Sequence, residues 1–328
     1  MLPRFTFSLL AASVSLVAAP VPTVRLTAGV LPGETVSMPV LSAGTAGYKG
    51  AAATAAVGRA LAAGFRHVHT AFDYYNLPEV GAALATVPRD QLFVSSMTSP
   101  CIHPASPPKR NVTSAAACYN LTLSEAAATL DALKLDSLDL LMLHGPSEAF
   151  GHLGKCSPLA CEMNAAQWRA YQQLRASGKV KAIGVSNFCQ SCFECLGSTT
   201  AADTPAVNQI QVHVGQGSKD PGGGLLSYCA AKGVVVQSYE PLAGGALAKD
   251  ADCARIGAAH NRSAAQVALR WVLQRAPSLA VRAGSRLHLV EDLSIFDFTL
   301  SDAELAALDA KTAPPGEAGG RCSWGCTE

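Results

Sequence analysis

The chain has 328 residues, a formal net charge of +1 and 15% charged residues, whereas 49% of its residues are hydrophobic. This composition is typical of a globular protein with a well-filled core. It excludes a disordered chain and a protein that binds nucleic acid through a basic surface. Beyond the N-terminus, no apolar run is long enough to span a bilayer. The length fits one large α/β barrel or two smaller domains.

The N-terminal segment, residues 1–19, has the pattern of a secretory signal peptide. Arg4 supplies the positive charge, residues 5–18 form the apolar stretch, and small residues follow at the cleavage site. An N-terminal membrane anchor is the alternative, but the apolar stretch is short and Pro20 follows it. We expect cleavage between Ala18 and Thr23. Residues 20–328 would then enter the secretory pathway as a single domain with no membrane segment.

Eleven cysteines also favour an oxidising compartment. Cys101 and Cys118 lie in one long connection, and Cys156 and Cys161 lie in another, so we expect surface insertions that disulfides hold in place. The run Cys189-Gln-Ser-Cys-Phe-Glu-Cys195 could instead hold a metal or a cluster, but no fourth ligand lies nearby and we expect no metal. Three triplets fit N-glycosylation, those that begin at Asn111, Asn120 and Asn261.

Apolar runs rich in β-branched residues alternate with alanine-rich segments of helical spacing. The expected strands are Pro39–Ala43, His67–Thr70, Leu92–Ser96, Leu138–Leu143, Ala182–Val185, Ala206–Val212, Val234–Tyr239 and Leu279–Arg282. The expected helices include Ala51–Ala63, Ser124–Leu133, Ala165–Ala176 and Ala264–Gln274. Near-continuous apolar strands between helices indicate a parallel sheet that is covered on its outer face. The pattern therefore favours an α/β fold of the closed (β/α)8 TIM-barrel type.

Two short runs precede the first barrel strand. Thr23–Leu26 and Thr35–Met38 flank a Pro-Gly turn and predict a β-hairpin that plugs the bottom of the barrel. A doubly wound sheet is the structural alternative. It would need a Gly-x-Gly-x-x-Gly turn after its first strand, and the sequence has none.

The stretch from Gly64 to Asn76, Gly-Phe-Arg-His-Val-His-Thr-Ala-Phe-Asp-Tyr-Tyr-Asn, resembles the signature of the aldo-keto reductase family. In that signature a buried strand ends in His-Ile-Asp-Thr-Ala, and a catalytic Tyr and an Asn follow. The resemblance implies that Tyr74 donates a proton to a substrate carbonyl. It places the family's catalytic Asp at His69 and its catalytic Lys at Met97. Because one charge of a buried pair is costly without the other, the site was reshaped as a unit.

His144 ends the run Leu138-Asp-Leu-Leu-Met-Leu-His and matches the family's His, which hydrogen-bonds the substrate carbonyl. The family commonly has Trp at the next position, and Gly145 there would open the pocket. A structural role for His144, and an ordinary place at the barrel rim for Tyr74, are the alternatives. An imidazolium at His69 could lower the pKa of the Tyr74 phenol as the missing Lys does.

The resemblance also implies a nicotinamide cofactor. Ser186, Asn187 and Gln209 would hydrogen-bond the carboxamide, and Tyr239 would stack on the ring. Glu240 replaces the family's usual Ser and adds a negative charge near the pyrophosphate path, which weakens binding unless the side chain turns away. The cofactor positions on this side of the site are Gly44, Thr45, Ser186, Asn187, Gln209, Tyr239 and Leu242.

At the eighth strand, the segment from Ala280 to Leu293 aligns with the part of the family pattern that binds the adenosine end. Arg282 falls at the family's Lys, His288 at its Arg and Asp292 at its Asn, while Glu291 is retained. Arg282 can still bind a phosphate bidentately. We therefore expect NADPH in preference to NADH, with a weaker grip on the 2′-phosphate than the family pattern provides.

These residues support three hypotheses. The first is an NAD(P)H-dependent, monomeric oxidoreductase that reduces a small-molecule carbonyl, with impaired or altered proton delivery. The second is a catalytically inactive barrel that binds a small molecule or a protein partner in the secretory pathway. The third keeps catalysis but uses His69 and Tyr74 as an acid–base pair for isomerisation or dehydration.

Overall fold

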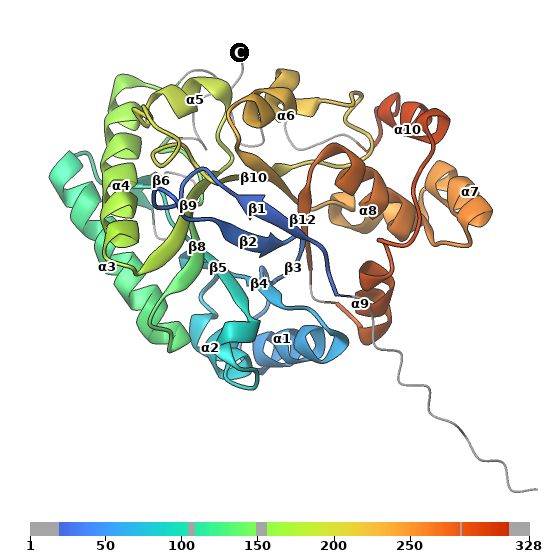
Figure 1. Cartoon of the computed structure of the whole chain (residues 1–328), viewed down its shortest axis with the longest axis horizontal. Helices are drawn as coiled ribbons and strands as arrows, with labels where there is room; N and C mark the ends of the chain where they lie inside the picture. The colour runs from blue at the N-terminus through green and yellow to red at the C-terminus, as the bar shows by residue number, and fades with distance from the viewer. Residues whose placement is uncertain (1–19, 104–108, 149–155, 283, 315–328) are drawn as a thin grey trace, which may run out of the picture.

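A computed structural model describes residues 20–103, 109–148, 156–282 and 284–314. Within these ranges, eight parallel strands close into a barrel that helices surround (Figure 1). The last strand pairs with the first, with Leu279 opposite Leu41. The barrel strands are β3 (Leu41–Gly44), β4 (His67–His69), β5 (Phe93–Thr98), β8 (Leu138–Leu143), β9 (Val180–Ser186), β10 (Val207–Gln211), β11 (Val235–Tyr239) and β12 (Ser278–Arg282). The predicted (β/α)8 barrel is confirmed.

The apolar side chains of strand β8 divide between two cores. In β8, Leu140 and Met142 belong to an inner cluster, whereas Leu141 and Leu143 belong to the larger cluster that the helices cover. This division follows from the strand itself, because successive side chains point to opposite faces. Every residue of β8 is buried, which explains why the strands are recognisable as continuous apolar runs.

The predicted N-terminal hairpin is also confirmed. It consists of the antiparallel strands β1 (Thr23–Leu26) and β2 (Val36–Pro39). Leu26 and Met38 are buried in the inner cluster, so the hairpin fills the barrel from below. Gly29 has a φ of +63° and lies so close to the barrel that a Cβ there would be 2.5 Å from the carbonyl oxygen of Ile183. Its own carbonyl accepts a hydrogen bond from the Ile183 amide at 2.9 Å.

Several helices begin at a serine or aspartate side chain that caps them. Ser263 caps α8 and Ser301 caps α10, each in a capping box. Ser114 caps α3, which therefore starts well before the predicted helix at Ser124 and occupies part of what the sequence suggested was a loop. The helices are α1 (Ala51–Ala63), α2 (Leu77–Leu84), α3 (Ala115–Leu133), α4 (Pro158–Ala176), α5 (Gln190–Glu194), α6 (Pro221–Ala231), α7 (Ala251–His260), α8 (Ala264–Arg275), α9 (Arg286–Leu293) and α10 (Asp302–Asp309), with 3-10 turns η1 (Phe72–Tyr74), η2 (Arg89–Gln91) and η3 (Ala243–Lys249).

Disulfides hold both long connections. Cys101 pairs with Cys118, next to the small hairpin of β6 (Ile102–His103) and β7 (Arg110–Asn111). The sequence left the other pairings open. In the structure, two disulfides join the start of α4 to the α5 segment, and they are Cys156–Cys192 and Cys161–Cys195. Cys189 is disulfide-bonded as well. The closely spaced cysteines are thus occupied by disulfides, and no metal-binding cluster is found in the described ranges.

Candidate active site

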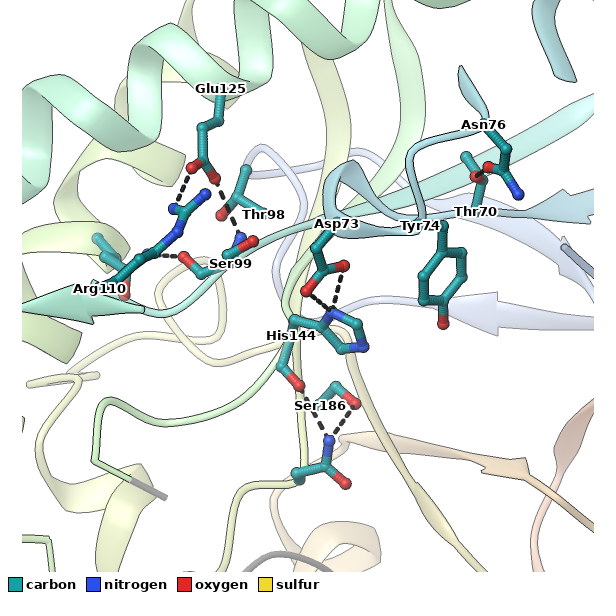
Figure 2. Close-up of polar contacts among 12 residues, drawn as sticks. Thr70, Asp73, Tyr74, Asn76, Thr98, Ser99, Arg110, Glu125, His144 and Ser186 are labelled. Atoms are coloured by element: carbon teal, nitrogen blue, oxygen red, sulfur yellow. Dashed lines mark hydrogen bonds and ion pairs between the residues drawn. The ribbon is translucent and has the colours of Figure 1, made fainter. Parts of the chain in front are cut away.

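The predicted catalytic residues Tyr74, His144 and His69 lie at the carboxyl ends of the barrel strands, where barrel enzymes carry their active sites. Tyr74 is in η1, just after β4, and His144 directly follows β8. Their rings lie 5.6 Å apart, centre to centre, in an edge-to-face arrangement. Ser186 ends β9 and lies below His144 in the close-up (Figure 2). Three separate strands, β4, β8 and β9, therefore bring this group together. His69, at the end of β4, also lies beside Tyr74, with the ring centres 6.5 Å apart.

Asp73 is a site residue that the sequence interpretation missed. Both of its carboxylate oxygens lie 2.9 Å from Nδ1 of His144 (Figure 2). Burial by itself raises the pKa of Asp73, but the hydrogen bond from His144 and its positive charge lower it, and the net shift is downward. An ionised Asp73 holds His144 with Nδ1 as donor. The signal was in the motif itself, because an acid beside the motif tyrosine at a strand end is a candidate for such a pair.

His69 belongs to a chain of buried hydrogen bonds that fixes its protonation. Nδ1 of His67 lies 3.0 Å from the Pro39 carbonyl, which can only accept, so this nitrogen carries the proton. Nε2 of His67 then accepts from the Ser95 hydroxyl at 2.9 Å, and the same hydroxyl oxygen accepts from Nδ1 of His69 at 3.0 Å. The remaining nitrogen of His69, Nε2, is buried and has no hydrogen-bond partner among the described residues.

The expectation of an imidazolium at His69 is wrong. Burial, and then the neighbouring His67 and His144, lower the pKa of His69 to about 3, and burial lowers that of His67 to about 4. A ring that resists protonation to this degree is neutral at physiological pH and is also a weak base. His69 therefore neither replaces the missing Lys nor supplies the base for isomerisation or dehydration.

The surroundings of Tyr74 keep its phenol neutral. Met97, at the family's Lys position, is fully buried in the inner apolar cluster, and Tyr74 packs against that cluster. Burial, followed by the charges of Asp73, Tyr239 and Glu240, raises the pKa of Tyr74 far above its ordinary value of about 10. Lys49 contacts Tyr74, but its ammonium group donates to the main-chain carbonyl at 2.8 Å.

The residues expected at the nicotinamide end form a hydrogen-bonded group next to His144. The Asn187 amide donates to the His144 carbonyl at 2.9 Å and to the Ser186 hydroxyl at 3.1 Å, and its oxygen accepts from the Tyr239 hydroxyl at 3.0 Å. Asn187 has a left-handed backbone, with φ of 60°, a conformation that costs about 1–3 kcal/mol and persists where contacts hold it. The side chain of Gln209 turns away from this group, since its amide donates to Gln237 inside the barrel at 2.7 Å, but its main-chain carbonyl accepts from the Ser186 hydroxyl at 2.8 Å.

The residues expected at the adenosine end lie on the surface around β12 and α9. Arg282 is exposed, and its guanidinium lies 4.7 Å from the ring centre of Tyr48. His288 is exposed, Glu291 is half-buried, and Asp292 is buried. Burial, and to a lesser extent the charge of Glu291, raises the pKa of Asp292 to about 7.

Three other cofactor positions lie between these two ends. Gly44 ends β3, and the carbonyl of the buried Thr45 accepts from the Asn76 amide at 2.9 Å. Leu242 is half-buried at the start of η3. Glu240 hydrogen-bonds Gln211 at 3.1 Å, so its carboxylate has a partner on β10.

A buried ion pair between Glu125 and Arg110 lies next to the turn that carries Asp73. Glu125 on α3 accepts from the Ser99 amide at 3.1 Å and pairs with Arg110 of β7 (Figure 2). The Arg110 guanidinium also lies 5.9 Å from the ring centre of Phe72 in η1. Although burial raises the pKa of Glu125, the pair with Arg110 joins the inserted hairpin to the turn that carries Asp73 and Tyr74.

Comparison with known proteins places this geometry in a family. Residues 41–313 match the model of the aldo/keto reductase family. The chain is 31% identical to glyoxal reductase of Bacillus subtilis (strain 168) over 260 residues, 79% of this chain and 83% of that protein. It is 30% identical to morphine 6-dehydrogenase of Pseudomonas putida over 292 residues, 84% of this chain and 88% of that protein.

A solved structure supports the same family assignment. The crystal structure of an aldo-keto reductase from a Medee basin deep-sea metagenome library superimposes with a TM-score of 0.71 and 26% identity, and the match covers 89% of this chain and 96% of that one. The chain therefore belongs to the aldo/keto reductase family, whose members are oxidoreductases that act on small-molecule carbonyl compounds with a nicotinamide cofactor.

Proposed function

We propose that this protein reduces the carbonyl group of a small molecule with NADPH, and that the carbonyl oxygen binds between Tyr74 and His144. The observation that carries the proposal is the direct link between the two halves of the site, the hydrogen bond from the Asn187 amide to the His144 carbonyl. It holds the cofactor-side residues and the substrate-side residues at adjacent strand ends. A bound reduced nicotinamide supplies hydride to the carbonyl carbon.

The residues present suit such a cofactor. Ser186 and Asn187 offer a hydroxyl and an amide, the donor and acceptor groups that a carboxamide needs. The aromatic ring of Tyr239 lies beside them, and its hydroxyl is already oriented by Asn187. At the other end, Arg282 presents an exposed guanidinium that suits a 2′-phosphate. Glu240 is the unfavourable group, and its hydrogen bond to Gln211 offers a place for its charge away from the pyrophosphate.

The cofactor proposal is tested by fluorescence titration of the purified, oxidised protein with NADPH and NADH. Arg282→Ala should weaken NADPH binding at least tenfold and NADH binding little, because only NADPH presents the 2′-phosphate. Arg255→Ala removes an exposed arginine on α7, paired only loosely with Asp252 at 3.7 Å, and serves as the matched control. Equal loss of both cofactors in Arg282→Ala would show that Arg282 does not contact that phosphate.

Two further outcomes concern the function as a whole. Tyr239→Ala should weaken both cofactors by about 1 kcal/mol through lost stacking. If neither cofactor binds, or if cofactor binds but no aldehyde is reduced by the wild-type protein, the inactive binding protein is the correct interpretation. Steady reduction of simple aldehydes excludes it.

We also propose that the protein is a monomer that passes through the secretory pathway after cleavage of its signal peptide. The leader, residues 1–19, lies outside the described residues. Three disulfides support an oxidising compartment, and all three candidate glycosylation sites, Asn111, Asn120 and Asn261, are exposed. In the described part of the chain, no helix has the length and apolar character needed to cross a bilayer.

A further inference from the structure

The pair of Asp73 and His144 lies where the substrate carbonyl is proposed to bind. Asp73 holds one ring nitrogen of His144 through two contacts of 2.9 Å. The main-chain carbonyl of the same histidine is held by Asn187. In Figure 2 the second ring nitrogen, Nε2, lies on the side of the ring that faces the Tyr74 hydroxyl. His144 is thus oriented at two points and presents Nε2 to the same space as the phenol.

Carbonyl reduction needs a proton at the oxygen when hydride reaches the carbon. If Tyr74 gave up that proton, its phenolate would form beside the charges of Asp73 and Glu240 and next to an apolar cluster that includes Met97. His69 would be neutral and could not offset the charge. A protonated His144 would instead become a neutral imidazole, and the Asp73 carboxylate would still accept from its Nδ1. Charge therefore favours donation from the histidine.

We propose that His144 delivers the proton to the carbonyl oxygen, that Asp73 is the positioning residue that holds its ring and balances its charge, and that Tyr74 acts as a neutral hydrogen-bond donor to the same oxygen. This inference rests on the proposed function. When hydride reaches the carbonyl carbon, the C=O π pair moves to oxygen. The Nε2–H bond of His144 breaks and an O–H bond forms, so the carbonyl is reduced to an alcohol and the cofactor is oxidised. Water returns the proton to His144.

Several other titratable groups face His144. Asp73 lies on η1, Tyr74 beside it, and His69 at the end of β4. His103 of β6 also interacts with both Asp73 and His144, and burial lowers its pKa. More distant from the ring are Arg110 and Glu125, which form their own pair. Because burial lowers the pKa values of both other histidines, they are neutral in the neutral pH range.

The test compares pH profiles of kcat/KM for the reduction of simple aldehydes with NADPH and for the oxidation of the matching alcohols with NADP⁺. Reduction should fall as pH rises, because the donor must carry its proton, and alcohol oxidation should rise over the same range. His144→Gln should lower reduction at pH 7 by about 10²–10⁴-fold and remove this dependence. Tyr74→Phe should lower both rates less and keep the dependence. Asp73→Asn should move the profile to lower pH, so that most of the lost activity returns in acid. Asp131→Asn, an exposed acid on α3, is the control.

A readout that needs no turnover accompanies the kinetics. In the cofactor-free protein, NMR of the histidine side chains should show different ring-nitrogen chemical shifts for His144 in Asp73→Asn and in wild type, with a folded spectrum in both. An unchanged profile in Asp73→Asn, or loss of all activity in Tyr74→Phe while His144→Gln remains active, would overturn this inference and leave the proposed function intact. Absence of any turnover by wild type with cofactor bound would overturn the proposed function itself.

Discussion

Asp292 should make the stability of the folded protein depend on pH. Its side chain is 7% exposed, and its pKa rises from 3.8 to about 7 on burial and through the charge of Glu291. Between these two values the folded protein keeps a proton that the unfolded chain releases. The free energy of unfolding therefore falls as pH rises from about 4 to about 7. At about 1.4 kcal/mol for each pH unit, the loss is roughly 4 kcal/mol as an upper limit.

The substitution Asp292→Asn restores the residue type that the family pattern has at this position and removes the titrating group. We expect the variant to be more stable than wild type at pH 8 by up to about 4 kcal/mol, and to differ little at pH 4.5, where the wild-type carboxyl is protonated. Guanidinium unfolding of the oxidised protein at a series of pH values measures both free energies.

The matched control is Asp131→Asn. Its carboxylate is exposed, and among the described residues its one ion pair is with the exposed Lys134. The free energy of unfolding should therefore change by less than about 1 kcal/mol at any pH. If wild type and Asp292→Asn show the same slope of stability against pH, the buried carboxyl does not carry the raised pKa and the reasoning fails.

Two further predictions concern the rebuilt centre and the disulfides. Met97→Lys and His69→Asp should each destabilise the protein by about 3–5 kcal/mol, because each buries an unpaired charge. The double change should cost less than their sum and should raise Tyr74-dependent reduction, whereas additive costs in a denaturant series would show that the two positions do not interact. Non-reducing peptide mapping of secreted material should recover the peptides of Cys156 and Cys161 linked to those from the α5 segment, and free thiols at both positions would refute the pairing.

Much of the fold could be predicted because the barrel imposes a simple pattern on the sequence. Strands that are buried on both faces are continuous apolar runs, and this is how β8 was recognised. The first half of α3 was missed because it follows a Pro- and Ser-rich stretch and carries a cysteine in a disulfide. Its N-cap, Ser114, was the available signal.

The sequence predicted several of the residues that lie at the candidate site, but it did not predict their protonation states or their hydrogen-bond partners. The motif gave the places of Tyr74 and His144, but the charge state of His69 depends on Ser95 from β5 and on a carbonyl before β3. No local pattern contains that chain of contacts. Asp73 was passed over for the same reason, since its role exists only when β8 brings His144 beside it. Hydrogen bonds and pKa shifts that depend on residues far apart in the sequence can be identified only from the folded barrel.

The disulfides from α4 to α5 have a practical consequence for anyone who produces this protein. The short helix α5 begins directly after the segment that carries Asn187, and two covalent bonds fasten it to the neighbouring connection. Material made in a reducing bacterial cytosol would lack these bonds, and its strand-end loops would be free to move. An inactive preparation of that kind would say nothing about the natural enzyme. A count of free thiols before the first assay therefore distinguishes a protein that lacks catalytic activity from a sample in which these disulfides did not form.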